Sequence, residues 1–341
     1  MGFFKQNIAI DLGTATVLVS VGKKGVVINA PSIVAVKDGS NKVIAIGEEA
    51  RAMMGRTPLD ITTVKPIQKG VISSYTTTRD MIEYFLDKAV TNPLKKMFQP
   101  EVIICVPSKT TNVEKRAVEQ AALDAGAHRT FLVEEPLAAA VGAGIDISRP
   151  NGNMIIDVGG GTTDIAVISY EGIVKSRSVK VAGDAFDETI KTYLKKKHNL
   201  MVGDRTAEQI KVEVGCLYHG IKNQSIEIRG SDLITGLPNE RVVTSEEILE
   251  PLIETAMPVL DGIHAVLEET PPELAADIYG KGIVMTGGGA LLAGFDELIR
   301  KSTGVDVSIA DEPQFCVVRG CSQILEEMSK TEKSEYGSKR R

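Results

Sequence analysis

The sequence has few of the residues that would place it outside the ordinary globular proteins. It has no tryptophan, and its four cysteines are scattered without a Cys-x-x-Cys pair or a histidine cluster, so we expect free thiols and no cysteine metal site. No apolar run reaches the roughly 18 residues of a membrane-spanning helix. The net charge of −6 argues against a broad nucleic-acid-binding face. These absences predict a cytosolic protein, or one that binds a membrane surface from the cytosol.

Strands alternate with helical segments along the chain, a pattern typical of α/β proteins, and 341 residues are enough for two domains. Thr111 and Glu114 form a capping box, which predicts the start of a helix, and Gly126 marks its end. A second capping box at Thr206 predicts the start of another helix. An apolar stripe over residues 245–267 predicts a long helix.

A short arrangement of acid, glycine and hydroxyl occurs twice, each time after an apolar strand. Asp157 opens the segment DVGGGTTD, and Asp11 lies in the segment IAIDLGTATVLVSV. Glycine lets backbone N–H groups turn toward a ligand, and a concavity of such groups binds anions. An aspartate beside them suits a hydrated Mg²⁺ that the same phosphates coordinate. Either turn alone is explained by a tight hairpin. The pair favours an internal duplication that holds one polyphosphate between the two halves.

A third glycine cluster follows another buried strand. The segment GIVMTGGGALL predicts a strand over residues 283–286, then three glycines at 287–289, then a helix from Ala290. No Gly-Lys-Ser/Thr follows, and the spacing is not G-x-G-x-x-G. The cluster therefore argues against a P-loop enzyme and against a protein kinase.

These three clusters, in this order, resemble the nucleotide site of the actin, sugar kinase and heat-shock chaperone superfamily. AIDLGTAT matches the first phosphate motif, IIDVGGGTTD the second and IVMTGGGALL the adenosine motif. Residues 134–144 and 313–325 resemble the two connecting helices, with small side chains where the helices would cross. Within the superfamily the chain is most similar to the MreB family of bacterial actins, over residues 7–325.

The resemblance implies an actin-like α/β fold, with two duplicated ribonuclease-H-like domains around a nucleotide cleft. The first domain is expected over residues 1–150, with a small subdomain at about 32–75. The second is expected over residues 151–328, with a small subdomain at about 182–245. Residues 329–341 have no periodicity and are expected to form a disordered basic tail.

The resemblance also implies roles for single residues, with ATP and Mg²⁺ as ligands. Glu135 corresponds to the acid that positions the attacking water, Thr162 to its partner, and Asp11 and Asp157 to the residues that hold Mg²⁺ through water. By residue chemistry alone Glu135 could instead complement a helix dipole, and the adjacent Glu134 competes for its role. The residues that match nucleotide-binding positions of the family are Gly13, Thr14, Ala15, Thr16, Gly159, Gly160, Gly161, Thr163, Gly183, Asp184, Glu208, Lys211, Gly287, Gly288, Gly289 and Ala290.

Several of these residues have simpler interpretations, and two depart from the family pattern. Glu208 and Lys211 lie three apart on one helix face, where a surface ion pair is the alternative to an adenosine contact. Asp184 could instead cap the following helix. Thr16 stands where many members carry asparagine, and Asp164 where many carry glutamate. These changes leave nucleotide binding expected and the rate of hydrolysis open.

The stretch NPLKKMFQPE places apolar side chains beside two lysines, a composition that suits insertion of a loop into an anionic membrane surface. The basic end of the chain would add electrostatic attraction. Packing of Phe98 against its own domain, and a merely solvated tail, are the alternatives. The residues expected at the membrane are Leu94, Met97, Phe98, Lys339, Arg340 and Arg341.

These features together favour a cytoskeletal ATPase that polymerises with copies of itself on the inner face of the cell membrane and helps to set cell shape. Its expected partners are itself, the membrane surface and other cell-shape proteins, and no nucleic acid. The main alternative is a small-molecule or sugar kinase of the same fold. A binding module that nucleotide only switches, without useful hydrolysis, is a third hypothesis. A chaperone fits least, since no substrate-binding domain follows.

Overall fold

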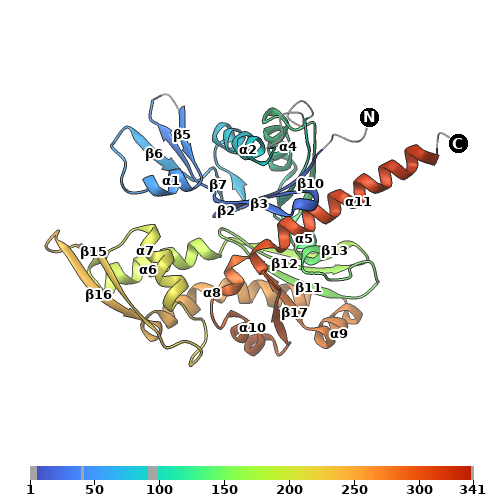
Figure 1. Ribbon diagram of the computed structural model, residues 1–341. Coiled ribbons are helices and arrows are strands. Elements are labelled where there is room, and N and C mark those ends of the chain that lie inside the picture. The colour runs from blue at the N-terminus through green and yellow to red at the C-terminus, as the bar shows by residue number, and fades with distance from the viewer. Residues whose placement is uncertain (1–5, 40–41, 91–98, 339–341) are drawn as a thin grey trace. The chain divides into compact units, whose positions relative to one another are not determined.

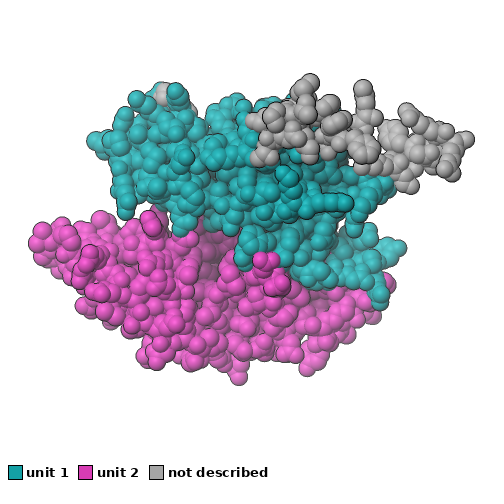
Figure 2. Space-filling view, in the orientation of Figure 1, with its two compact units in different colours: residues 1–149, 170–172, 314–341 teal, residues 150–169, 173–313 magenta. Residues whose placement is uncertain are grey.

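The computed structural model describes residues 6–39, 42–90 and 99–338 (Figure 1). The chain divides into two compact units, which Figure 2 shows in different colours. Unit 1 comprises residues 1–149, 170–172 and 314–341, and unit 2 comprises residues 150–169 and 173–313. Each unit contains one five-stranded sheet and one three-stranded sheet.

The large sheet of unit 1 has the strand order β10-β9-β1-β2-β3. Strands β1, β2 and β3 form an antiparallel meander, whereas β9 runs parallel to β1, and β10 runs parallel to β9. The strands are β1 (Asn7–Leu12), β2 (Thr16–Val21), β3 (Val26–Pro31), β9 (Glu101–Val106) and β10 (Arg129–Glu134).

Alternation along β1 assigns its side chains to the two faces of this sheet. Ile8, Ile10 and Leu12 belong to the core that includes α2 (Tyr75–Ala89) and α4 (Asn112–Asp124). The opposite face, which includes Asp11, is covered by α11 (Cys316–Ser338), and α11 also packs against α5 (Glu135–Gly142). The site residue Asp11 is therefore on the side of α5 and α11.

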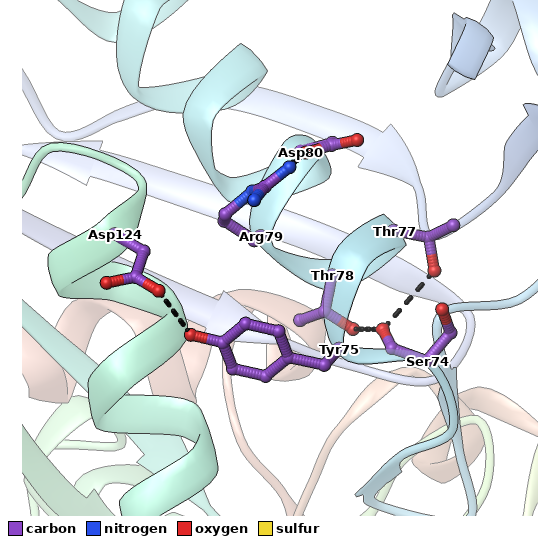
Figure 3. A network of polar contacts seen from close by, with 7 residues as sticks. All are labelled: Ser74, Tyr75, Thr77, Thr78, Arg79, Asp80 and Asp124. Atoms are coloured by element: carbon purple, nitrogen blue, oxygen red, sulfur yellow. Dashed lines mark hydrogen bonds and ion pairs between the residues drawn. The ribbon is translucent and has the colours of Figure 1, made fainter. Parts of the chain in front are cut away.

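Helices α2 and α4 are joined by polar contacts at their ends (Figure 3). The Tyr75 hydroxyl donates to Oδ2 of Asp124 at 2.6 Å. The hydroxyls of Thr77 and Thr78 both donate to the carbonyl oxygen of Ser74, at 3.3 and 2.8 Å, in the first turn of α2. The first bond joins the start of α2 to the end of α4, and the other two lie within the first turn of α2.

The smaller elements of unit 1 follow the meander. Its three-stranded sheet has the order β5-β4-β6 and packs with the short helix α1. The elements are β4 (Val34–Lys37), β5 (Lys42–Ile46), α1 (Glu48–Met53), β6 (Ile61–Val64), β7 (Ile67–Gln68) and β8 (Val71–Ile72).

The large sheet of unit 2 has the order β13-β12-β11-β17-β18, which repeats the order of unit 1 strand for strand. Here too the first hairpin is antiparallel, and the last two strands run parallel to the first. The strands are β11 (Asn153–Val158), β12 (Thr163–Ser169), β13 (Gly172–Val179), β17 (Ile283–Thr286) and β18 (Val307–Ile309). The duplication expected from the two turns thus extends to the order of whole sheets.

Five helices and a small sheet of order β14-β15-β16 complete the described part of unit 2. Helix α8 packs against β12, and α6 packs against both α7 and α8. The elements are α6 (Gly183–His198), β14 (Leu200–Met201), α7 (Asp204–Val214), β15 (Ser225–Asp232), β16 (Pro238–Thr244), α8 (Ser245–Glu268), α9 (Pro272–Lys281) and α10 (Phe295–Thr303).

Two of the helix signals are confirmed. The Thr111 side chain accepts a bond from the backbone of Glu114, whose carboxylate in turn accepts from the Thr111 backbone, so the capping box starts α4 as predicted. Gly126, with φ of +101°, follows the end of that helix. The long helix expected over 245–267 is α8.

Three expectations about helix ends are wrong. Helix α7 begins at Asp204 after Gly203, so Thr206 lies inside the helix and does not cap it. No α-helix starts at Ala290: a single 3₁₀ turn, Gly288–Leu291, includes two glycines of the third cluster, and the next α-helix begins only at Phe295. Helix α11 continues through Ser338, so residues 329–338 are helical where we expected a disordered tail. They extend a helix that is packed on the sheet at its start, they include two lysines and two glutamates, which favour helix, and they contain no proline.

None of the helices in the described part of the chain is long and apolar enough to cross a membrane.

Candidate functional site

The two hairpin turns singled out in the sequence have the same length and the same register. Leu12 pairs with Val17 in unit 1, and Val158 pairs with Thr163 in unit 2, so residues 13–16 and 159–162 form the respective connections. Each turn begins with a glycine and ends with a threonine, one strand residue after an aspartate. The two turns are therefore equivalent residue by residue.

Both opening glycines are required by close backbone packing. A Cβ on Gly13 would lie 2.7 Å from the carbonyl oxygen of Thr16, and a Cβ on Gly159 would lie 3.2 Å from that of Thr162. The Gly159 N–H donates to the same Thr162 oxygen at 2.9 Å, which closes the turn. Glycine at these positions lets the backbone fold back on itself beside the strand end.

The aspartate of unit 1 is supported by a thiol. The Cys105 Sγ lies 3.2 Å from Oδ1 of Asp11, and the Cys321 thiol of α11 contacts Cys105 in turn. Although Asp11 keeps partial solvent access, burial by the surrounding strands and helix raises the pKa of its carboxyl to about 6, and the bond from Cys105 offsets part of that rise. A cation near Asp11 would favour the ionised form.

The aspartate of unit 2 is supported by a hydroxyl. Thr286, the last residue of β17, donates to Oδ1 of Asp157 at 2.7 Å, and Asp157 is 5% exposed. Asp164 lies directly across the hairpin from Asp157 and is fully buried, and its Oδ2 accepts a bond from Ser178 at 3.2 Å. The turn of unit 2 thus starts between two buried acids that neighbouring strands support.

The threonines in and next to the turns differ in whether their hydroxyl protons remain available for a ligand. Thr163 donates its proton to the carbonyl oxygen of Val181 at 2.7 Å, so it fastens the turn to the segment before α6 and could offer a phosphate no proton while that bond is kept. Thr14 accepts a bond from the Gly70 N–H at 3.2 Å, which leaves its proton for donation. Thr162 is buried within its turn.

The N-terminus of α6 is bonded to the turn of unit 2. The backbone N–H groups of Gly183 and Asp184 donate to the carbonyl oxygens of Gly159 and Gly160, at 3.2 and 2.8 Å. On α7, the Lys211 ammonium donates to the Gly183 carbonyl oxygen at 3.1 Å. Glu208 lies one helical turn before Lys211, on the same face of α7. The structure thus brings together these predicted residues of unit 2.

The third glycine cluster packs against the start of the same turn. A Cβ on Gly287 would lie 2.2 Å from the Val158 carbonyl oxygen, and one on Gly289 would lie 2.4 Å from a Val158 side-chain carbon. A Cβ on Gly288 would meet nothing within 4 Å, and Ala290 is fully buried. Two of the glycines therefore serve packing on β11, and Gly288 leaves its side of the turn open.

The two candidate acids at the start of α5 have different surroundings. Glu134 is the N-cap residue, and its carboxylate forms an ion pair with Lys115 at 3.2 Å. Glu135 is the first residue of the helix, and proline follows it. The two acids thus differ in their place at the start of α5, and the role of Glu135 in orienting water stays a prediction.

Some predicted site residues lie outside the described part of the chain. They are Leu94, Met97, Phe98, Lys339, Arg340 and Arg341. Among residues 6–39, 42–90 and 99–338, no group of three or more histidine, cysteine, aspartate or glutamate side chains could hold a metal ion alone. The carboxylates of Asp11 and Asp157 are oxygen donors of the kind that Mg²⁺ prefers, with further ligands from water and phosphate.

Three side chains that support the site do not stand out in the sequence. Thr286 and Cys105 each hold one of the aspartates, and Asp187 pairs with Lys211 at 2.9 Å. Thr286 and Cys105 are on strands that neighbour the aspartate strands, so the sheet order, once known, would have pointed to both. Asp187 lies four residues after Gly183, one turn along α6.

Comparison with known proteins agrees with this geometry. The family model described as MreB/Mbl protein matches residues 5–333. The cell shape-determining protein Mbl of Bacillus cereus is 47% identical over 331 residues, which are 97% of this chain and 98% of that protein. A crystal structure of MreB 5 of Spiroplasma citri bound to AMPPNP has a TM-score of 0.91 and 38% identity, covering 97% of this chain and 98% of that one.

A more distant structure, the MamK double helical filament, has 21% identity and a TM-score of 0.81, covering 94% of this chain and 99% of that one. At this level of identity the likeness concerns the fold. It shows that the described elements form an actin-like fold.

Proposed function

Because the chain belongs to the MreB/Mbl family, we propose that it is a cell shape-determining, actin-like ATPase that polymerises on the inner face of the cell membrane. The observation that carries this proposal is the pair of equivalent turns, each with an aspartate, an opening glycine and a closing threonine, at the same place in two sheets of the same strand order. The relative from Spiroplasma citri, similar over nearly the whole chain, was solved with AMPPNP.

The residues of the two turns suit the phosphates of ATP. The glycines let backbone N–H groups approach an anion, and Thr14 has a hydroxyl proton to donate. Bound Mg²⁺ would spread the charge that develops on the phosphates. Asp11 and Asp157 would hold it through water, each fixed by its own donor, Cys105 or Thr286.

The remaining roles concern water and the adenosine. Glu135 orients the attacking water, with Thr162 as its partner on the second turn. Lys211 and Glu208 on α7 contact the adenosine, and the glycines at 287–289 line its other side. The bonds from Gly183 and Asp184 to the turn support this assignment, since they join the start of α6 to the phosphate-binding residues.

Filament formation and membrane association complete the proposal. Filaments require a contact between copies of the chain that repeats without closing into a ring. The apolar and lysine-flanked sequence at residues 94–98 suits contact with an anionic membrane, and many copies in a filament would raise its avidity. Other cell-shape proteins are the partners expected on such a filament.

The test is phosphate release measured alongside sedimentation, with Mg-ATP, for the wild type, Glu135→Ala and the matched control Glu134→Ala. We expect the wild type and both variants to pellet, and only Glu135→Ala to lose phosphate release, by about a hundredfold or more, as for loss of a general base. Glu134→Ala should keep release near that of the wild type.

Two results would contradict the proposal. If the wild type neither pellets nor turns over until a sugar or another small hydroxyl compound is added, the protein is a kinase of the same fold. If Glu134→Ala loses phosphate release and Glu135→Ala keeps it, the role of orienting water belongs to Glu134.

A further inference from the structure

The ammonium group of Lys211 is held in place from two sides. Its Nζ donates to Oδ2 of Asp187 at 2.9 Å and to the carbonyl oxygen of Gly183 at 3.1 Å. The side chains of Lys211 and Asp187 are only 16% and 17% exposed. An ammonium has three protons, so these two bonds leave one for another acceptor.

The held ammonium lies beside the turn of unit 2. A Cβ on Gly183 would be 3.5 Å from the Lys211 Nζ, from the Gly159 carbonyl oxygen and from the Gly160 Cα alike. Gly183 also donates its N–H to Gly159. The charge of Lys211 is thus fixed next to the residues proposed to bind phosphate, and Asp187 is the side chain that fixes it.

Asp187 occupies this position at a cost to folding. Its Oδ1 is buried and has no hydrogen-bond partner in the described structure. Burial raises the pKa of the Asp187 carboxyl above its ordinary value, against the effect of Lys211, which favours the ionised form. A buried carboxylate oxygen without a partner is destabilising. The carboxylate therefore neutralises the buried Lys211 ammonium while one of its own oxygens is left without a partner.

A second ion pair joins the same two helices and provides a comparison. Lys191 of α6 lies 2.7 Å from Asp204 of α7, with Asp204 61% exposed. Lys191 also pairs with Glu188 at 2.6 Å. This pair faces solvent and does not touch the turn, as expected for a surface contact between helices. Of these two pairs, only Asp187–Lys211 is buried beside the candidate site.

We infer that Asp187 is a positioning residue for nucleotide recognition, which holds the Lys211 ammonium so that its third N–H donates to an oxygen of a bound adenine nucleotide. The inference rests on the proposed function, because the adenine nucleotide is the ligand that the proposed function assigns to the site. It adds a residue that touches no nucleotide: the buried carboxylate acts only through Lys211. The loss of folding stability at Oδ1 is then the cost of a preorganised cation.

The first experiment measures the affinity for Mg-AMPPNP by calorimetry, at protein concentrations below polymerisation, for the wild type, Asp187→Asn and the control Asp204→Asn. We expect Asp187→Asn to bind about tenfold more weakly, as for loss of one charge-assisted contact. Its thermal midpoint without nucleotide should fall below that of Asp204→Asn, because the buried Lys211 ammonium loses its charged partner, so affinities are compared at a temperature where every variant is folded. The control should bind as the wild type does.

The second experiment asks whether Asp187 acts through Lys211. In a Lys211→Met background, Asp187→Asn should cause no further loss of AMPPNP affinity. If Lys211→Met does not fold, because it leaves Asp187 buried and unpaired, the double variant is compared with Asp187→Asn alone. It should bind about equally, because the contact through Lys211 is already lost in Asp187→Asn.

The outcomes separate this inference from the proposed function. If the wild type binds AMPPNP and Asp187→Asn binds equally well, the inference fails and the proposed function stands. The inference also fails if Asp187→Asn costs the same factor with Met at 211 as with Lys, or if the double variant binds several-fold more weakly than Asp187→Asn. If the wild type itself binds no AMPPNP, the proposed function fails first.

Discussion

The same hairpin turn is built twice in this chain, but the two units support it with different chemistry. In unit 1 the aspartate beside the turn, Asp11, accepts a bond from a thiol, and burial raises the pKa of the Asp11 carboxyl to about 6. In unit 2 the aspartate rests on the hydroxyl of Thr286, and a second buried acid lies directly across the hairpin. Strand order and turn length are repeated, whereas the side chains behind the turns are not. The repeat therefore gives the two units the same strand order and turn, and the supporting residues give each turn its own properties.

The units also differ in how closely a glycine of a helix packs against its neighbours. In unit 1, α5 and α11 cross with backbone against backbone, since a Cβ on Gly320 would lie 1.8 Å from the Ala138 carbonyl oxygen. In unit 2, α8 lies on side chains, and a Cβ on Gly262 would meet the ends of Ile165 and Val179, both at 2.9 Å. Side-chain ends can move, and a helix backbone cannot do so without separating the helices.

The largest expected effect follows from this second difference. Gly320→Ala should lower the free energy of unfolding by more than about 3 kcal/mol, at or beyond the upper end for overpacking, because α5 and α11 must move apart. Gly262→Ala should cost about 1 kcal/mol, since side chains can adjust and alanine favours the helix. Urea denaturation of both variants measures the difference. Equal losses would show that the crossing yields as easily as side chains do.

A smaller effect concerns the aspartate of unit 1 and pH, in protein free of metal and nucleotide. Because the pKa of folded Asp11 is about 6, against an ordinary value of 3.8, the folded state binds more protons between these values. The free energy of unfolding should therefore fall as pH rises from about 4 to 6, by up to about 3 kcal/mol. Asp11→Asn should lack this loss.

The measurement is urea denaturation of the wild type and Asp11→Asn at pH 4.5 and pH 7. The variant should gain on the wild type as pH rises, and the other titrating groups cancel in the comparison. Asp157→Asn serves as the matched substitution in unit 2. A difference between the wild type and Asp11→Asn that stays constant across this range would contradict the assigned pKa.

The smallest effects compare the two donors. Thr286→Val keeps the shape of a fully buried side chain and removes the hydroxyl that supports Asp157, so it should cost about 2 kcal/mol. Cys105→Ala removes a weak S–H donor together with a buried sulfur atom and should cost about 1 kcal/mol. Thermal unfolding without nucleotide ranks the two. A larger loss for Cys105→Ala would mean that its contact with α11, and not its bond to Asp11, dominates.

Local features of the fold were predictable where a few neighbouring residues decide them. The capping box at Thr111 and the two turns needed no information from distant parts of the chain. The helix start predicted at Thr206 is wrong because the same motif is equally compatible with a position inside a helix that starts after Gly203. The prediction of a disordered tail is wrong for residues 329–338, because polar composition alone does not show that they continue a helix that packs on the sheet.

The supporting residues of the site were not predictable, because they come from distant strands. Thr286 is 129 positions from Asp157, and Cys105 is 94 positions from Asp11. The alternation of side chains gives the face on which each residue lies, but not which strands are neighbours. Asp187 and Lys211 are close in sequence, yet their pairing depends on how α6 and α7 pack.

Helix α11 has a consequence for the order in which the protein is made. It covers β1 and β9, and Ser329 accepts a bond from Asn7 at 2.8 Å, 322 positions away. Residue 314, where the chain returns to unit 1, is 165 positions after residue 149. At ribosomal speeds of about 5–20 residues per second, one face of the first sheet remains uncovered for roughly 10–30 s until α11 is synthesised. Over that interval the nascent chain exposes the face of the sheet that includes Asp11. At this stage the chain can either bind a chaperone or aggregate.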